Sequence, residues 1–324
     1  MAVSIYLGID VGAVSIKAAA VLPRPAADGL TFGSASGLRR LAGTTSRGDW
    51  AVLVARPRRT RGRPLEVSRE LLEQLLADLP AERIAGMRLT GSGAGLVAEA
   101  LGCRTCNEFQ ACCRAVDELH PQARTVLAVG GETSRYLRLE PDPASGRLSI
   151  MDYSMNGDCA AGTGAFLDQQ AARLKYRVED IGAVVEEAER AAQIAGRCSV
   201  FAKSDMIHAQ QKGFRPPEVL RGLCNAVATN FKSAVVRGRR VEPPVLLVGG
   251  VSANTAVVAA LRGVFELSEQ ELLVPEAAES VDAVGAALLA AESSGPDAVS
   301  VTTRLERLTA VSYTHLTLPT IYSV

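Results

Sequence analysis

An aspartate and a glycine end the first apolar stretch of the chain. Asp10 follows residues 5–9, in which large apolar side chains alternate with smaller or polar ones, and Gly12 comes two positions later. A carboxylate at a strand end is a ligand that Mg²⁺ prefers, and a neighbouring glycine lets a backbone amide approach a phosphate. Lys17 adds a positive charge nearby. The pattern points to a magnesium–nucleotide site, although an Asp-x-Gly after a strand is also typical of an ordinary turn.

Two further glycine pairs follow apolar runs. The first consists of Gly130 and Gly131, with Glu132, Thr133 and Ser134 directly after them, and the second of Gly249 and Gly250. The amides and hydroxyls of the first pair suit phosphate oxygens. The second pair has no side chain to obstruct an adenine or a ribose. Each pair alone is also typical of hairpin chemistry, but three such turns in this order favour a nucleotide site.

A glycine-rich stretch and two cysteines form the next group. Gly162, Thr163 and Gly164 precede a predicted helix, where backbone amides bind anions. Cys159 lies just before them, and Cys198 lies 39 residues later at the start of another predicted helix. A helix N-terminus lowers the pKa of a thiol, so both are candidate metal ligands, with small buried thiols as the alternative. Two thiolates cannot complete an iron–sulfur cluster of four ligands, but a symmetric dimer supplies the other two.

Three other groups give weaker signals. The spacing of Cys103, Cys106, Cys112 and Cys113 is a poor match for tetrahedral zinc, so we do not expect a metal there. The arginine-rich residues 56–63 offer contact with an acidic partner or with CoA phosphates, but a solvated loop is the favoured interpretation. The histidines show no ligand spacing, and we expect His208 to be a surface residue; the three are His120, His208 and His315.

The elements that must position these residues follow from periodicity. Residues 5–22 and 125–140 both predict strand, glycine turn and strand, which indicates a duplicated fold. A further short strand is expected at 84–90, and a strand, turn and helix at 245–262. The predicted helices are 65–79, 111–119, 164–175, 179–193, 200–212, 217–236 and 281–291. After Ser293 no period is visible, and residues 310–324 resemble a translated adapter sequence, so they are left out of the fold prediction.

Composition limits the class of protein. The chain has 324 residues, with Lys+Arg 35 balancing Asp+Glu 35, so nothing in the overall charge attracts nucleic acid or an anionic membrane. Apolar residues make up 48% of the sequence, which is ordinary globular composition. No apolar run reaches the roughly 20 residues of a membrane span, and the N-terminus does not read as a signal peptide. We therefore expect a cytoplasmic protein. An odd number of cysteines, 7, favours thiols or metal ligands over disulfides.

Five segments occur in an order that resembles a known family. They are LGIDVGAVSIKAA, VGGETSRY, MNGDCAAGTGAFLD, GRCSVFAKSD and LLVGGVSANTAV. In this order they are similar to the BadF/BadG/BcrA/BcrD ATPases, which activate 2-hydroxyacyl-CoA dehydratases or form the ATPase subunits of benzoyl-CoA reductases. The resemblance covers about residues 4–291. The two cysteine segments are highly specific, whereas the glycine turns are shared with actin, heat-shock chaperones and sugar kinases.

The resemblance implies an α/β fold of two RNase H-like lobes with ATP in the cleft between them. The lobes would be residues 1–120 and 121–293, with the last helix returning to the first lobe, and 294–324 would be a tail. Asp10 and Gly12 would match the first phosphate motif, Gly130 and Gly131 the second, and Gly249 and Gly250 the adenosine motif, with residues 162–164 also near the nucleotide. Asp10 and Glu132 would organise Mg²⁺ and water.

The resemblance also implies the redox chemistry. Cys159 and Cys198 of two subunits would hold one [4Fe–4S] cluster, and ATP turnover would drive a low-potential electron from a ferredoxin or flavodoxin to an acyl-CoA dehydratase or reductase. Where the family's second phosphate motif usually reads Asp-Ile-Gly-Gly-Gln-Asp-Ser-Lys, this chain has Ala128 first and Glu132 in place of the glutamine. This motif looks similar to the variant found in large multidomain activase-like proteins, in which such a module comes first; together with the adapter-like tail, this leads us to expect an N-terminal fragment of one. Two alternatives remain open, a sugar-kinase-type phosphotransferase and a nucleotide-sensing module with little turnover.

Overall fold

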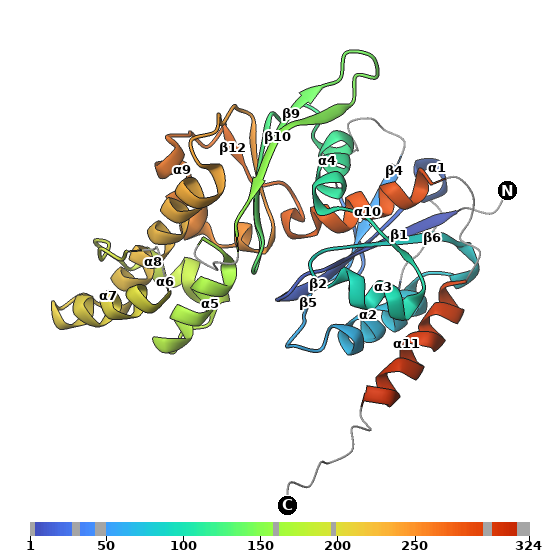
Figure 1. The fold of residues 1–324 in the computed structure, drawn as a ribbon, viewed down its shortest axis with the longest axis horizontal. Helices are drawn as coiled ribbons and strands as arrows, with labels where there is room; N and C mark the ends of the chain where they lie inside the picture. The colour runs from blue at the N-terminus through green and yellow to red at the C-terminus, as the bar shows by residue number, and fades with distance from the viewer. Residues whose placement is uncertain are drawn as a thin grey trace, which may run out of the picture. The chain divides into compact units, whose positions relative to one another are not determined.

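The computed structural model describes residues 4–27, 33–42, 50–157, 162–195, 199–293 and 300–315. Its chain divides into two compact units (Figure 1). Unit 1 combines residues 1–120 with residues 280–324, and unit 2 consists of residues 121–279. The second unit is therefore inserted into the sequence of the first. No helix in the described parts of the chain is both long and apolar enough to cross a membrane.

Unit 1 contains a mixed sheet with the strand order β3-β4-β2-β1-β6-β7, in which β5 also pairs with β2. The first strands form an antiparallel hairpin because a tight turn joins β1 to β2, whereas β6 and β7 add in parallel orientation after helical crossovers. The strands are β1 (Ile5–Val11), β2 (Ser15–Pro23), β3 (Arg39–Arg40), β4 (Trp50–Val54), β5 (Arg58–Arg59), β6 (Ile84–Thr90) and β7 (Arg104–Thr105).

Helices cover both faces of this sheet. The helices are α1 (Arg24–Ala27), α2 (Pro64–Asp78), α3 (Ala94–Leu101), α4 (Glu108–Leu119), α10 (Val281–Ala291) and α11 (Val301–His315). The alternating side chains Ile5, Leu7 and Ile9 of β1 join the leucines of α2 and α3 in one apolar core. The opposite face carries α10, whose backbone lies against Gly8, and α4 packs beside α10 (Figure 1).

Unit 2 repeats this strand plan. Its sheet has the order β10-β9-β8-β11-β12, with an antiparallel first hairpin and parallel later strands. In both sheets the first strand lies between its antiparallel hairpin partner and a later parallel strand, which is β6 in unit 1 and β11 in unit 2. This equivalence confirms the predicted duplication. The strands are β8 (Thr125–Val129), β9 (Ser134–Pro141), β10 (Leu148–Met155), β11 (Val245–Val248) and β12 (Leu272–Leu273).

The helices of unit 2 build a second apolar core on one face of its sheet. Leu127, Val129 and Tyr136 from the sheet pack there with Phe166 and Phe231. The α-helices are α5 (Gly164–Arg173), α6 (Ile181–Glu186), α7 (Ser199–Gln211), α8 (Pro216–Asn230) and α9 (Thr255–Phe265), and a π-helical turn, Phe231–Val236, continues α8.

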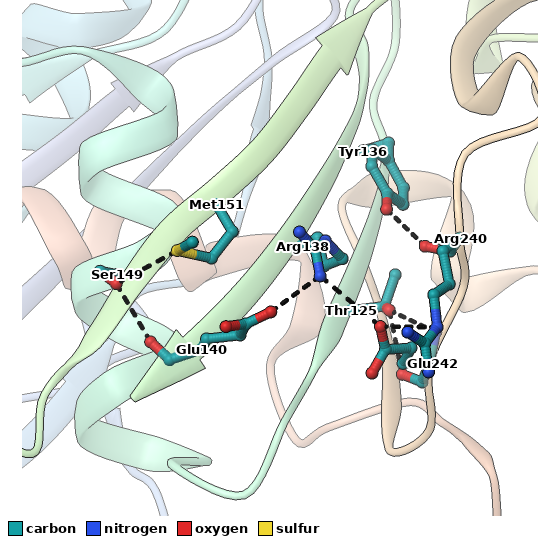
Figure 2. A network of polar contacts seen from close by, with 8 residues as sticks. All are labelled: Thr125, Tyr136, Arg138, Glu140, Ser149, Met151, Arg240 and Glu242. Carbon is teal, nitrogen blue, oxygen red and sulfur yellow. Dashed lines mark hydrogen bonds and ion pairs between the residues drawn. The ribbon is translucent and has the colours of Figure 1, made fainter. Parts of the chain in front are cut away.

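Polar contacts hold the end of the β8–β9 hairpin that lies away from its turn (Figure 2). The Thr125 hydroxyl donates to the carbonyl of Glu242 at 2.9 Å, and the Tyr136 hydroxyl donates to the carbonyl of Arg240. Arg138 lies opposite Thr125 and pairs with Glu140 at 2.7 Å. These contacts tie both strands to the segment that leads into β11. They fix the direction in which the hairpin presents its glycine turn.

Two helix predictions need correction. The helix expected at 179–193 ends at Glu186, because the segment after it runs along α8, where the Ala192 amide donates to the Glu218 carbonyl at 3.0 Å. A helix not expected after Ser293 is present as α11. The apolar period of this helix is interrupted, because Arg304 lies between Val301 and Leu308 on the buried face. The Arg304 guanidinium donates there to the carbonyls at the end of α3.

Candidate functional site

The first hairpin turn carries a buried ion pair. Asp10 is 6% exposed, and the Lys17 ammonium lies 2.9 Å from its Oδ2 atom. The two residues face each other across the β1–β2 ladder. Lys17 also donates to the Ser15 carbonyl at 3.2 Å, and the Gly12 amide donates to the same carbonyl at 3.1 Å. The predicted residues Asp10, Gly12 and Lys17 are thus brought together in one turn, with the carboxylate fixed in place.

A glycine loop after β6 packs directly on Asp10 and was missed by the sequence prediction. Gly91 has φ +99°, and a Cβ atom there would lie 2.5 Å from Asp10 Oδ1. The Gly93 amide donates to the Val11 carbonyl at 2.8 Å. The sequence signal was available, since Gly-Ser-Gly stands between a predicted strand and a helix. Only glycine fits at position 91, because any side chain would displace the carboxylate.

The second hairpin turn has the same backbone geometry but different side chains. The Gly130 amide donates to the Thr133 carbonyl at 2.9 Å, as the Gly12 amide does to Ser15 in unit 1. Ala128 occupies the position that corresponds to Asp10, and Arg135, only 5% exposed, lies opposite it where Lys17 lies in unit 1. Glu132 is exposed at the turn. The two carboxylates predicted to be catalytic therefore belong to different units.

The start of α5 is fastened to this second turn. The Gly164 amide donates to the Gly130 carbonyl at 2.8 Å, and the Ala165 amide donates to the Gly131 carbonyl at 2.7 Å. The Ser134 hydroxyl, which is fully buried, donates to the Gly162 carbonyl at 2.9 Å. Two amides at the start of the helix and the serine hydroxyl thus bind protein carbonyls. They join two of the predicted segments into one rigid piece, with Thr163 buried between them.

The third predicted turn, at Gly249, lies at the same end of the unit 2 sheet as the Gly130 turn. It has φ +92°, and a Cβ atom there would lie 2.5 Å from the Val129 carbonyl oxygen. It corresponds to Gly91 of unit 1, since each follows the parallel neighbour of the first strand. A Cβ atom on Gly164 would lie 2.9 Å from a methyl carbon of Val251. Around Gly250, by contrast, a Cβ atom would meet nothing within 4 Å.

The two candidate cluster ligands, Cys159 and Cys198, lie outside the described residues. Their surroundings are partly described: α7 begins at Ser199, directly after Cys198, and α7 contacts α5, which begins at Gly164. Both cysteines therefore precede helices that pack together. Helix N-termini stabilise the thiolate that a metal requires.

Burial disfavours the thiolate form of three other cysteines. Burial raises the pKa of Cys106 and of Cys113 to about 11, and that of Cys224 to about 12, so these thiols stay protonated at neutral pH. Within the described ranges, His, Cys, Asp and Glu side chains form no group of three or more that is arranged to hold a metal ion. His208 is exposed on α7, as expected.

The profile of the BadF/BadG/BcrA/BcrD ATPase family matches residues 7–290. The matched residues include all three glycine turns. The chain belongs to this family. It is an ATPase with the α/β architecture of two RNase H-like lobes that the resemblance implied. The sequence prediction of the family and of the fold is confirmed.

Individual relatives of the chain are named as activators of acyl-CoA dehydratases. The chain is 31% identical over 287 residues to the activator of lactoyl-CoA dehydratase from Anaerotignum propionicum. The aligned region covers 89% of this chain and 97% of the relative. It is 32% identical over 184 residues to the 2-hydroxyisocaproyl-CoA dehydratase activator of Clostridioides difficile, over 57% of this chain and 66% of the relative. The solved structure of that activator from Clostridium difficile with bound ADPNP shares the fold, with a TM-score of 0.64, 23% identity, and coverage of 98% and 100% of the two chains.

Proposed function

We propose that this ATPase is an iron–sulfur activator that uses ATP to drive low-potential electron transfer to an acyl-CoA dehydratase or reductase. The observation that carries the proposal is the attachment of α5 to the Gly130 turn through two amide hydrogen bonds of 2.8 and 2.7 Å. Cys159 lies just before α5. A movement of the turn on ATP binding or hydrolysis is thereby transmitted to the segment of a candidate cluster ligand.

The residues of the turns take separate roles in this proposal. Asp10 holds Mg²⁺, for which a fixed, largely buried carboxylate is a suitable oxygen ligand. Glu132 orients the attacking water. The glycines of three turns let phosphates and adenosine approach the backbone closely, while the amides of Gly12, Gly130 and Gly249 hold the turns in shape by donating to protein carbonyls. The residues of the nucleotide site are Gly12, Lys17, Gly130, Gly131, Thr133, Ser134, Gly162, Thr163, Gly164, Gly249 and Gly250. Ser134 and Gly164 act by holding the second turn in shape, since both are engaged with protein carbonyls.

The redox part of the proposal requires two copies of the chain. Cys159 and Cys198 of each copy would hold one [4Fe–4S] cluster, and that cluster supplies a one-electron donor at low potential. The proposed partners are a second copy, an acyl-CoA dehydratase or reductase component, and a ferredoxin or flavodoxin as electron donor. Relatives named as activators of such dehydratases support this choice. We propose a cytoplasmic location for the assembly.

Iron and acid-labile sulfide analysis of protein purified without oxygen tests this function. We expect about four irons per two chains and a visible absorption band. Cys159→Ser and Cys198→Ser should each lose both. Cys106→Ser is the matched control, because Cys106 is a half-buried thiol with a raised pKa, and it should keep the iron. A colourless wild-type protein that still binds ATP would exclude the electron-transfer mechanism.

A nucleotide-sensing module with little turnover is a second candidate. Ala128 and Arg135 favour it, because the second hairpin lacks the carboxylate–ammonium pair of the first. Hydrolysis of ATP measured with and without the reduced cluster separates the two functions. The kinase alternative requires a catalytic aspartate as base, and the second turn offers only Glu132 and Thr133.

A further inference from the structure

The arginine-rich residues 56–63, interpreted from the sequence as a solvated loop, are hydrogen-bonded to the turn that contains Gly12. Arg58 and Arg59 form β5, which pairs with β2. The next residue fastens the stretch to the turn itself. The Thr60 amide donates to the Val14 carbonyl at 2.9 Å, and the Thr60 hydroxyl donates to the Gly12 carbonyl at 3.1 Å.

The register of the ladders places Arg59 on the same face of the sheet as Asp10. Arg59 lies opposite Ser15, and Asp10 lies opposite Lys17. Residues opposite each other in a ladder, and residues two apart in one strand, project to the same face. Ser15 and Lys17 are two apart on β2. The side chains of Arg59, Lys17 and Asp10 therefore project from one face, at the end of the sheet that carries the turn.

Arg58 provides an independent check, because it projects to the other face. Its guanidinium donates to the side chain of Gln74 on α2 at 2.5 Å. Ile16 lies opposite Arg58 in the ladder and belongs to the same apolar core as the leucines of α2. Since neighbouring residues in a strand alternate between faces, Arg59 projects away from α2.

The charges on this face suit an anion. The Lys17 ammonium is within 3.2 Å of the Ser15 carbonyl oxygen, and Arg59 is the exposed residue opposite Ser15. One carboxylate and two cations thus share one face of the sheet beside the Gly12 turn. A guanidinium can bind two phosphate oxygens at once, so an arginine is well suited to this position.

We propose that Arg59 binds the phosphate end of ATP and is a nucleotide-binding residue of unit 1 beside Gly12 and Lys17. The proposal rests on the nucleotide site described under the proposed function. On the shared face Arg59 supplies an exposed positive charge, whereas Asp10 is buried and paired with Lys17. The ligand class is a nucleoside polyphosphate, and the expected specificity is for the phosphates over the base.

Nucleotide affinity measured by titration calorimetry tests the proposal. Arg59→Ala should weaken ATP binding about tenfold to a hundredfold, the range expected for lost hydrogen bonds to a charged group, and should leave AMP binding unchanged. Arg59→Lys should fall between wild type and Arg59→Ala, since it keeps the charge but loses the paired geometry. Arg56→Ala removes another exposed arginine of the same stretch and should bind ATP as wild type does.

The outcomes separate this inference from the proposed function. If wild-type protein binds ATP and Arg59→Ala binds it equally well, the role of Arg59 is overturned and the nucleotide site stands. If Arg56→Ala weakens ATP as much as Arg59→Ala does, only general surface charge is involved, and the inference fails. If the wild-type chain binds no ATP, both proposals fail. Melting temperatures of all three variants, expected to equal that of wild type, show that the comparison concerns folded protein.

Discussion

At the scale of single residues, the two hairpins differ although their backbones correspond. The first turn has a carboxylate and an ammonium 2.9 Å apart, and the second has alanine and a buried arginine at the matching positions. A carboxylate paired on one side keeps its charge and its position, which is what a magnesium ligand requires. In the proposed function, the magnesium ligand is therefore Asp10 of the first turn. The second turn carries the charge of Glu132, and its two glycine carbonyls accept the hydrogen bonds that attach α5.

Asp10→Asn should reduce ATP hydrolysis by about a hundredfold or more, the usual effect of removing one group that stabilises transition-state charge. It should also lower the melting temperature, because Lys17 would be left largely buried without its counter-ion. Phosphate release measured under saturating ATP gives the rate. Glu66→Gln, at an exposed carboxylate paired with Arg63, is the matched control and should retain full activity. Unchanged hydrolysis in Asp10→Asn would contradict the assigned role.

At the scale of elements, α10 is held between β1 and α4 by contacts that exclude side chains. A Cβ atom on Gly8 would lie 2.0 Å from the Ala283 carbonyl oxygen, and one on Gly285 would lie 1.7 Å from the Ala111 carbonyl oxygen. Helix α10 is rich in alanine, and its small side chains let backbones approach closely. The sheet is thus covered at Gly8 by α10, which packs tightly against α4.

Gly285→Ala should destabilise unit 1 by about 1–3 kcal/mol or more, because the new methyl group meets backbone that cannot move aside without separating α10 from α4. Urea unfolding followed by circular dichroism provides the measurement. Gly263→Ala is the matched control, since a Cβ atom at this position of α9 meets nothing within 4 Å. It should be neutral or slightly stabilising. Equal stability of the two variants would show that the helices adjust to the added methyl group.

At the scale of the whole molecule, the chain passes between its two units twice, after His120 and before Ser280. Each unit repeats one strand plan, with a glycine turn after its first strand and a glycine of positive φ after the strand that pairs in parallel with the first. His120 ends α4 directly at the first passage, and burial lowers its pKa below the usual value of 6.5. The folded protein therefore disfavours the charged imidazole at this position.

The stability of the protein should fall as the pH is lowered through 6.5. Between the ordinary pKa and the lowered pKa, the unfolded chain binds a proton at His120 that the folded chain does not, so protonation favours unfolding. Free energies of unfolding at pH 7.5 and pH 5.5 measure the effect. His120→Gln should show a smaller decrease than wild type, whereas His208→Gln, at an exposed position, serves as the comparison. An identical decrease in wild type and His120→Gln would contradict this assignment.

The sequence by itself determined the local features of this protein. Glycine turns after apolar runs, amphipathic helices such as α2, apolar helices such as α10, and the order of the motifs are set by residues close together in the chain. These features were sufficient to predict the duplicated fold and the family. They also placed Asp10, Gly12 and Lys17 in one turn, because a hairpin brings its own neighbours together.

Only the tertiary structure decided the contacts between distant segments. Ladder register placed Arg59 on the face of Asp10, and the packing of Gly91 against that carboxylate joins residues from two strands. Helix α11 escaped notice because Arg304 lies on its buried face, where it binds the carbonyls that end α3. In each case the partner is dozens to hundreds of residues away. A pattern in one segment carries no information about the partner that makes a charged or small residue fit.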